Sequence, residues 1–139
     1  MEPLTISRRI AWGDLDPAGI VFYPRYYEWI DGVAHLFFEH LGVDHQQLLT
    51  EEKLAFGLIQ TSCRYFSPGF YHDWITIIPA IIEVNPKRFS LEYQIAKADG
   101  QKVAVAREDR ACLSLADPTH LTSAPIPEQI YRIFKQNLV

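Results

Sequence analysis

One long helix constrains the fold of this chain more than any other segment. From Pro24 the apolar residues recur at helical spacing as far as Leu41, and Gly42 is typical of the left-handed stop just past a helix. Trp29 and Leu36 lie outside that stripe, so the apolar surface of the helix is broader than one face. We therefore expect other parts of the chain to surround most of it.

Five strand-like segments can provide this cover. They are residues 4–12, in which apolar and polar side chains alternate, and residues 56–66, 74–84, 89–97 and 102–116. Asp99-Gly100 predicts a hairpin turn between the last two, which favours an antiparallel sheet. Pro79 predicts an edge position or a bulge, and residues 127–136 a short terminal helix.

The predicted fold class is α+β, with an antiparallel five-stranded sheet wrapped around a long central helix. Such a sheet leaves open edges, which favour pairing with a second copy of the chain. The 139 residues are 48% hydrophobic and 22% charged, which fits a single domain over residues 1–139.

Composition also excludes several classes of protein. A net charge of -4 argues against binding nucleic acid by bulk electrostatics. We find neither a signal peptide nor an apolar run long enough to cross a bilayer, so we expect a cytoplasmic protein with no membrane partner. Cys63 and Cys112 are predicted to be buried reduced thiols, and the five histidines lack metal-ligand spacing.

A short loop with two aspartates precedes the long helix. Asp16 to Gly19, DPAG, fits a type I turn, and that structural role is enough to explain these residues without a catalytic one.

The start of the helix favours a second interpretation, in which this region binds a ligand. Pro24 suits the first helical position, so Tyr23 becomes the N-cap, and tyrosine supplies no capping oxygen. A helix amino end with free N–H groups can bind an anion or a polarised carbonyl. Arg25 also indicates a ligand site, because an acidic residue would suit the helix dipole better in the first turn than this cation does.

A carboxylate one loop before such a helix end suits acyl transfer. The N–H groups stabilise a carbonyl oxygen as it becomes an oxyanion, while the carboxylate attacks the carbonyl carbon or removes a proton from water. Asp14 either supports the loop through backbone hydrogen bonds or is a solvated turn residue.

The stretch GDLDPAGIVFYPRYYEWID resembles the motif of the 4-hydroxybenzoyl-CoA thioesterase family of hotdog-fold proteins, in the branch whose catalytic aspartate precedes the central helix. The element order from about residue 4 to residue 135 agrees with that fold. The resemblance implies that Asp16 is the catalytic carboxylate and that the Tyr23 backbone N–H is the main oxyanion donor. It also implies a homodimer whose sheets join side by side, with sites at the interface, or a homotetramer of two such dimers. Arg25 departs from the aromatic-acyl members, which carry a smaller polar residue there.

The resemblance extends to residues that would bind substrate. It places Asp31 near the polar substituent of an aromatic ring; the alternative is a structural hydrogen bond across a dimer interface. Trp29 belongs to the core or to the wall of the acyl pocket. Lys87, Arg88 and Ser90, in PKRFS, lie where the family places the phosphates of coenzyme A; the alternative is a solvated turn.

Other charged residues have plainer interpretations. Glu28 is expected to be a solvated or paired acid, although another hotdog branch places its catalytic carboxylate on the helix. Arg107 and Arg110 are weaker candidates for binding coenzyme A, because arginines in strands often pair with acids such as Glu108 or Asp109.

The predicted function is hydrolysis of an acyl-CoA thioester, with an aromatic, hydroxybenzoyl-like acyl group, to a carboxylic acid and free coenzyme A, without metal or cofactor. The alternatives are a short-chain aliphatic acyl-CoA thioesterase, a hotdog dehydratase that uses His35, and a non-catalytic acyl-CoA-binding protein. Whether Asp16 is a nucleophile or a general base stays open.

Overall fold

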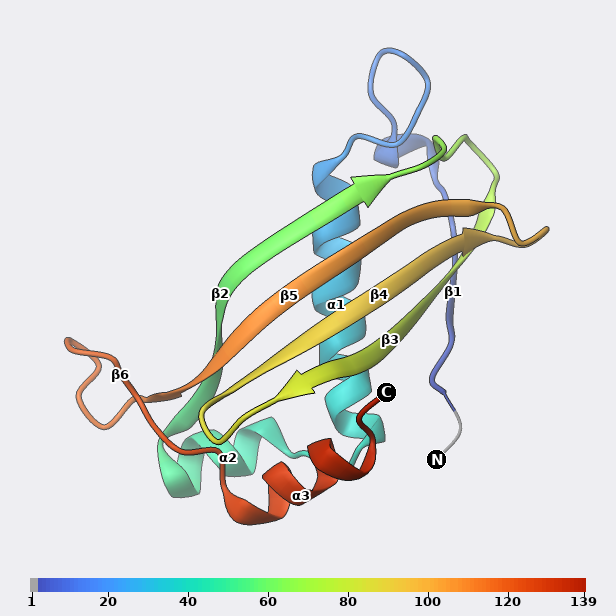
Figure 1. Cartoon of the computed structure of the whole chain (residues 1–139). Coiled ribbons are helices and arrows are strands. Elements are labelled where there is room, and N and C mark those ends of the chain that lie inside the picture. Colours follow the sequence, from blue (N-terminus) through green and yellow to red (C-terminus); the bar gives the residue numbers. More distant parts are fainter. Residues whose placement is uncertain (1–2) are drawn as a thin grey trace.

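The computed structural model describes residues 3–139 of the chain (Figure 1). The elements, in order, are β1 (Ile6–Arg9), the short 3-10 helix η1 (Trp12–Asp14), α1 (Pro24–His40), α2 (His45–Glu52), β2 (Leu54–Tyr65), β3 (Trp74–Val84), β4 (Arg88–Lys97), β5 (Lys102–Ser114), β6 (Thr122–Ser123) and α3 (Glu128–Gln136).

The strands form one antiparallel sheet in the order β1-β3-β4-β5-β2, with the two-residue β6 added to β5. The five predicted strands and the α+β class are therefore confirmed. Pro79 lies at an edge, as predicted, because β1 pairs with β3 only as far as Ile77. Proline has no N–H to donate, and at this position no residue of β1 is paired with β3 to accept such a hydrogen bond.

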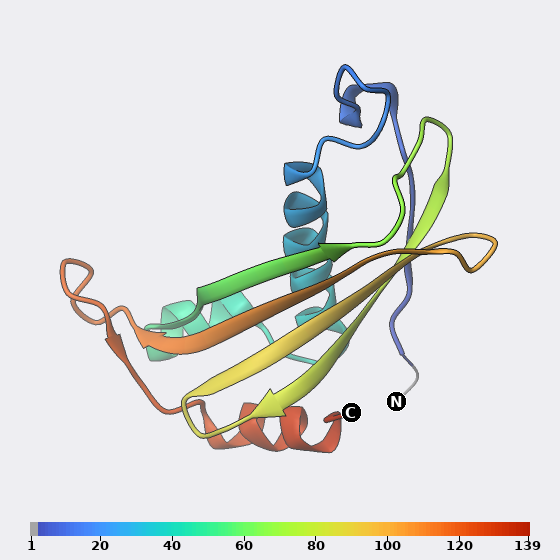
Figure 2. The same ribbon diagram turned by 45° about the horizontal axis from the view of Figure 1, so that its top comes forward.

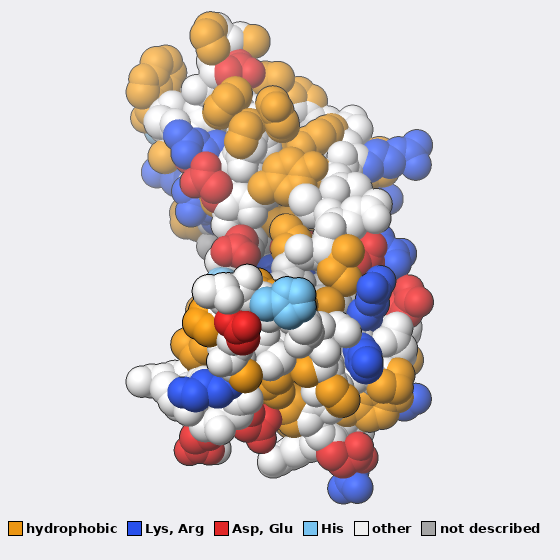
Figure 3. Space-filling view, turned by 90° about the vertical axis from the view of Figure 1, so that its left-hand side faces the viewer, with side chains coloured by type: hydrophobic (Ala, Val, Ile, Leu, Met, Phe, Trp, Pro, Cys, Tyr) orange, Lys and Arg blue, Asp and Glu red, His pale blue; other side chains and the backbone are white. Residues whose placement is uncertain are grey.

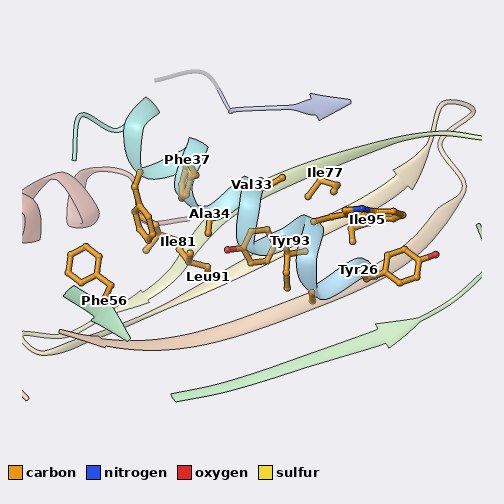
Figure 4. Packing of buried hydrophobic residues seen from close by; sticks show 14 of the residues in the cluster. Tyr26, Val33, Ala34, Phe37, Phe56, Ile77, Ile81, Leu91, Tyr93 and Ile95 are labelled. Atoms are coloured by element: carbon orange, nitrogen blue, oxygen red, sulfur yellow. The ribbon is translucent and has the colours of Figure 1, made fainter. Parts of the chain in front are cut away.

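α1 packs against one face of this sheet (Figure 4), and the apolar stripe that recurs at helical spacing is buried. Phe37 and Ala34 belong to one core cluster with Leu91 and Tyr93 of β4, on that face. The expectation that the helix is surrounded is wrong for a single chain. The other side of α1 stays exposed, and Leu36 on that side is 45% exposed.

The structure adds one helix, α2, that the sequence analysis does not predict. Asp44 caps α2, since its Oδ1 accepts hydrogen bonds from the N–H groups of Gln46 and Gln47 at 3.0 and 3.2 Å. α3 confirms the predicted terminal helix and buries Phe134 against Phe89. Within residues 3–139, none of the helices has the length and apolar character needed to cross a membrane.

The loop before α1 is a small hairpin that packs on the segment leading into β3. Leu15 and Val21 pair across the hairpin, and the Val21 N–H donates to the Gly69 carbonyl at 3.0 Å. Gly69 allows this close approach. A Cβ there would lie 2.7 Å from Ile10 Cδ1 and 3.1 Å from the Tyr26 hydroxyl oxygen. The hairpin can therefore pack in this position because Gly69 has no side chain.

We expect Gly69→Ala to destabilise the protein by about 1–3 kcal/mol, because the added methyl overpacks this contact. Urea unfolding would measure the change, with Gly13→Ala as the matched control, since a Cβ at Gly13 meets nothing within 4 Å. Equal midpoints for the two variants would show that the contact at Gly69 is not tight.

Candidate active site

Asp16 lies in the turn of the hairpin before α1. Its main-chain oxygen accepts from the Gly19 N–H at 3.0 Å, and its Oδ1 accepts from the Ala18 N–H at 2.8 Å. The predicted turn is therefore confirmed. Among the described residues, Oδ2 of Asp16 has no hydrogen-bond partner, which leaves this oxygen able to act on a substrate.

Asp14 holds the base of the same hairpin. Its Oδ2 accepts from the Ala11 N–H at 2.8 Å, its carbonyl accepts from the Phe22 N–H at 2.8 Å, and Arg8 approaches its Oδ1 at 3.6 Å. The predicted supporting role through backbone hydrogen bonds is confirmed. Asp14 therefore sets where the chain enters α1.

The first turn of α1 leaves one backbone donor free. The Arg25 N–H donates to the Phe22 carbonyl and the Tyr26 N–H to the Tyr23 carbonyl, at 2.9 and 3.2 Å, while Pro24 has no N–H. No side chain caps the helix. Within residues 3–139 the Tyr23 N–H has no acceptor, so the positive end of the helix dipole presents this donor to a ligand.

A cavity of about 300 Å³ opens beside this donor, and Tyr23, Tyr26, Tyr65, Phe66 and Gly69 form part of its lining. Burial raises the pKa of Tyr26 to about 12, so this phenol stays neutral at neutral pH and cannot serve as a base. The side of the molecule that carries β2 and α1 shows hydrophobic side chains gathered over the upper part (Figure 3). An apolar acyl group can be held there.

Asp31 belongs to a row of side chains on the exposed side of α1. Tyr23, Tyr27 and Asp31 recur at four-residue intervals, which places them along one side of a helix. Asp31 is already engaged, since its Oδ1 lies 3.3 Å from Nη2 of Arg110 and its Oδ2 lies 3.5 Å from Nε2 of His35. Its side chain is still 58% exposed, so it can accept a further hydrogen bond.

Two other predicted residues of α1 take structural positions. Trp29 is buried against Tyr26, with the Arg8 guanidinium 4.6 Å from its ring centre, and it does not line the cavity. It belongs to the core, the first of the two predicted alternatives. Glu28 pairs with Arg25 at 2.8 Å, as expected for a paired acid.

Lys87 lies in the turn between β3 and β4, and Arg88 is the first residue of β4; Asn85 Oδ1 accepts from both of their N–H groups. Within the described chain neither side chain has a carboxylate partner. The turn lies at the opposite end of the sheet from the Asp16 hairpin (Figures 1 and 2). β3 joins the two regions, and its eleven residues span roughly 35 Å at about 3.3 Å per residue. One chain therefore does not bring Lys87 and Arg88 to its own Asp16.

Ser90 lies near Arg88, on the sheet face that α1 does not cover. Both residues line a hollow of about 280 Å³. The Ser90 hydroxyl donates to Asp109 Oδ1 at 2.6 Å and accepts from Arg107 at 3.3 Å. The hydrogen bond from Ser90, followed by the nearby Arg107 guanidinium, lowers the pKa of Asp109 against the effect of its partial burial. Ser90 is thus committed to an outer-face network.

The sequence analysis underrated the inner face of β5. Glu108 and Arg110 are buried, at 2% and 5% exposed, and they pair there with each other. The sequence could have predicted this burial, because alternate residues of a strand share a face and Glu108 and Arg110 alternate with the apolar Ala106 and Cys112.

The chain matches the family model of the thioesterase-like superfamily over residues 10–134. It is 29% identical over 130 residues to a 4-hydroxybenzoyl-CoA thioesterase from Pseudomonas sp. strain CBS-3, a match that covers 89% of this chain and 92% of that protein.

Two solved structures show the same fold. A gentisyl-coenzyme A thioesterase matches with a TM-score of 0.81 and 32% identity, covering 94% of this chain and 99% of its own. A mutant 4-hydroxybenzoyl-CoA thioesterase, with asparagine in place of an aspartate and complexed with 4-hydroxybenzoyl-CoA, matches with a TM-score of 0.86 and 26% identity, covering 94% and 97%.

Proposed function

The chain belongs to the thioesterase-like superfamily, and we propose that it hydrolyses aromatic acyl-CoA thioesters to a carboxylic acid and free coenzyme A. The free N–H of Tyr23 at the uncapped start of α1, one hairpin away from the unpaired Oδ2 of Asp16, is the observation that carries the proposal. The gentisyl-CoA and 4-hydroxybenzoyl-CoA thioesterases that resemble the chain support the aromatic acyl group.

The chemistry follows from these two groups. The thioester carbonyl oxygen accepts a hydrogen bond from the Tyr23 N–H, which strengthens as negative charge develops on that oxygen. Asp16 then either attacks the carbonyl carbon, which breaks the C–S bond, releases coenzyme A as the thiolate and leaves an anhydride that water hydrolyses, or takes a proton from the attacking water, after which the same C–S bond breaks and coenzyme A leaves. Single-turnover hydrolysis in oxygen-18 water distinguishes these courses, because only the anhydride course leaves label on Asp16.

The complete site needs two subunits. β2 has only β5 as a neighbour, so its other edge is open, and Leu58 and Ile59 on it are about half exposed. If two β2 edges join antiparallel, the Asp16 end of one chain lies beside the Lys87–Arg88 end of its partner. The two cations then meet the phosphates of a coenzyme A whose thioester lies at the first chain's Tyr23. Such a homodimer, or a tetramer of two, would work in a reducing cytoplasm, where Cys63 and Cys112 stay free thiols.

We expect the wild-type protein to release thiol from a panel of CoA esters and to favour ring-bearing acyl groups over butyryl- or hexanoyl-CoA. Asp16→Asn should keep the fold and the oligomeric state but lower kcat at least ~100-fold, because a positioned base or nucleophile is lost. Near-wild-type turnover by Asp16→Asn would remove Asp16 from the mechanism. Faster turnover of every aliphatic ester would overturn the aromatic assignment alone.

The role of the Tyr23 N–H can be tested by removing that hydrogen. Tyr23 has φ of −55°, which proline can adopt, so Tyr23→Pro deletes the donor while keeping this torsion. We expect kcat to fall by about 100-fold or more, as for loss of an oxyanion donor. Tyr23→Ala is the matched control, because it removes the ring and keeps the N–H. If both variants lose the same activity with circular dichroism unchanged, the ring and not the N–H is what matters.

The two-subunit site predicts complementation. We expect the protein to sediment as a dimer or tetramer, and Lys87→Ala/Arg88→Ala to raise KM about tenfold or more. Heterodimers of that double variant with Asp16→Asn chains can be purified through two different tags. One of their two sites then combines an intact Asp16 with an intact Lys87 and Arg88 and should have the wild-type KM, while the other site carries all the substitutions. A raised KM in the heterodimer would place the cations in the same chain's site, and a fully active monomer would exclude the shared site.

A further inference from the structure

His45 is the first residue of α2, and its ring packs against the aromatic core. The ring centre lies 5.0 Å from that of Phe38 and 5.9 Å from that of Phe56, edge to face in both cases. Its Nε2 is buried, and among the described residues this atom has no hydrogen-bond partner. A titratable group therefore forms part of the contact between α2 and the rest of the protein.

α2 has little else to hold it in place. Among its eight described residues, Leu48 is the buried one, and the neighbouring Leu49 is 46% exposed. A helix of this length is not stable by itself, because isolated helices shorter than about 12 residues rarely persist in water. The position of α2, at the end of the sheet where β2 begins, therefore depends on how Leu48 and His45 pack (Figure 1).

Protonation of His45 opposes this packing in two ways. The neutral ring can leave Nε2 as an unused acceptor, but the protonated ring carries a charged N–H there, and a buried charged donor without a partner costs far more. As the first residue of α2, a charged His45 also lies at the positive end of the helix dipole. The neutral ring and the docked helix therefore stabilise each other.

The charged groups around the ring do not remove this cost. Burial has the largest effect and lowers the pKa of His45. His35 of α1, whose ring centre lies 5.5 Å away, and Arg110 of β5 lower that pKa further. The carboxylates of Asp44, which caps α2, and of Glu39 on α1 act in the opposite direction but do not restore the ordinary value.

We propose that His45 is an acid-sensitive switch, whose neutral ring holds α2 on the aromatic core and whose protonation releases α2. The inference is independent of the proposed function. Release uncovers Phe56, which packs on Phe89 and Phe134 and whose carbonyl accepts from Arg110 at 3.4 Å. It also removes the support of α2 from the start of β2, the strand whose open edge is proposed to join the partner subunit.

The direction of the pH dependence follows from proton linkage. Well above pH 6.5, the ordinary pKa of histidine, the ring of His45 is neutral whether α2 is docked or released. As the pH falls below this value, the released state binds a proton that the docked state does not, so docking weakens. The loss is complete once the pH is below the lowered pKa of the docked state, where both states bind the proton.

Hydrogen exchange of the α2 amides tests this switch, since it measures local opening. The Leu48 N–H, which donates to the Asp44 carbonyl at 3.0 Å, is one such probe. Between about pH 7 and pH 5.5, its protection factor in the wild type should fall severalfold, up to about tenfold, because release binds one proton. Binding of a dye for exposed apolar surface should increase over the same interval. A constant protection factor would overturn the proposal.

His45→Leu removes the titrating ring and puts an apolar side chain in its place. Its α2 amides should keep a constant protection factor over this pH interval. His35→Gln is the matched control, because it removes the neighbouring ring of α1, whose side chain is 55% exposed, and leaves His45 in place. This control should retain the acid-induced fall. An equal fall in His45→Leu, or its disappearance in His35→Gln, would show that His45 is not the switch.

A second measurement uses the wild type alone, so it does not require His45→Leu to fold. In a proton NMR titration the His45 ring should titrate with a pKa below 6.5, the ordinary value. A pKa at or above that value would overturn the proposal. Failure to release thiol from any CoA ester would refute the proposed function and leave this result untouched, so the two failures are distinguishable.

Discussion

Burial of one face of α1 against the sheet is the constraint on which the rest of the structure depends. The core is built from the aromatic and aliphatic side chains of that face and the inward residues of the strands, whose removal from water contributes about 25 cal/mol per Å². The sheet covers only that face. The opposite side of α1 and the open edge of β2 are left together on one side of the molecule, and this is where the candidate site lies.

The amino end of α1 joins stability to chemistry. Asp14 and Gly69 determine where the hairpin enters the helix, and the Tyr23 N–H at the first turn has no acceptor among the described residues. A side-chain cap would stabilise the helix but would occupy the place of a carbonyl oxygen. The structure therefore keeps a less favourable helix start where a substrate would bind.

β5 divides its charged residues between the two faces of the sheet. Glu108 and Arg110 face α1, where they reach Asp31, whereas Arg107 and Asp109 face outward with Ser90. The two-residue period of a strand separates them. In the function proposed here, the outer pair borders the region that binds coenzyme A, because Arg107 and Asp109 line the same hollow as Arg88.

The sequence by itself determined the parts of this protein that depend on nearby residues. The helix from Pro24, the five strands, the turn at Asp16 and the uncapped Tyr23 all follow from local spacing and backbone chemistry, and α2 had a local signal too, in its cap at Asp44.

Tertiary structure alone decided which distant side chains meet. Arg110 reaches Asp31 across 79 positions, Trp29 is covered by Arg8, and Lys87 is held a strand length away from Asp16. Local patterns specify the period and the ends of an element, but such contacts depend on how strands are ordered, how far each one runs and which face of α1 the sheet covers. Those quantities arise only when the whole core packs.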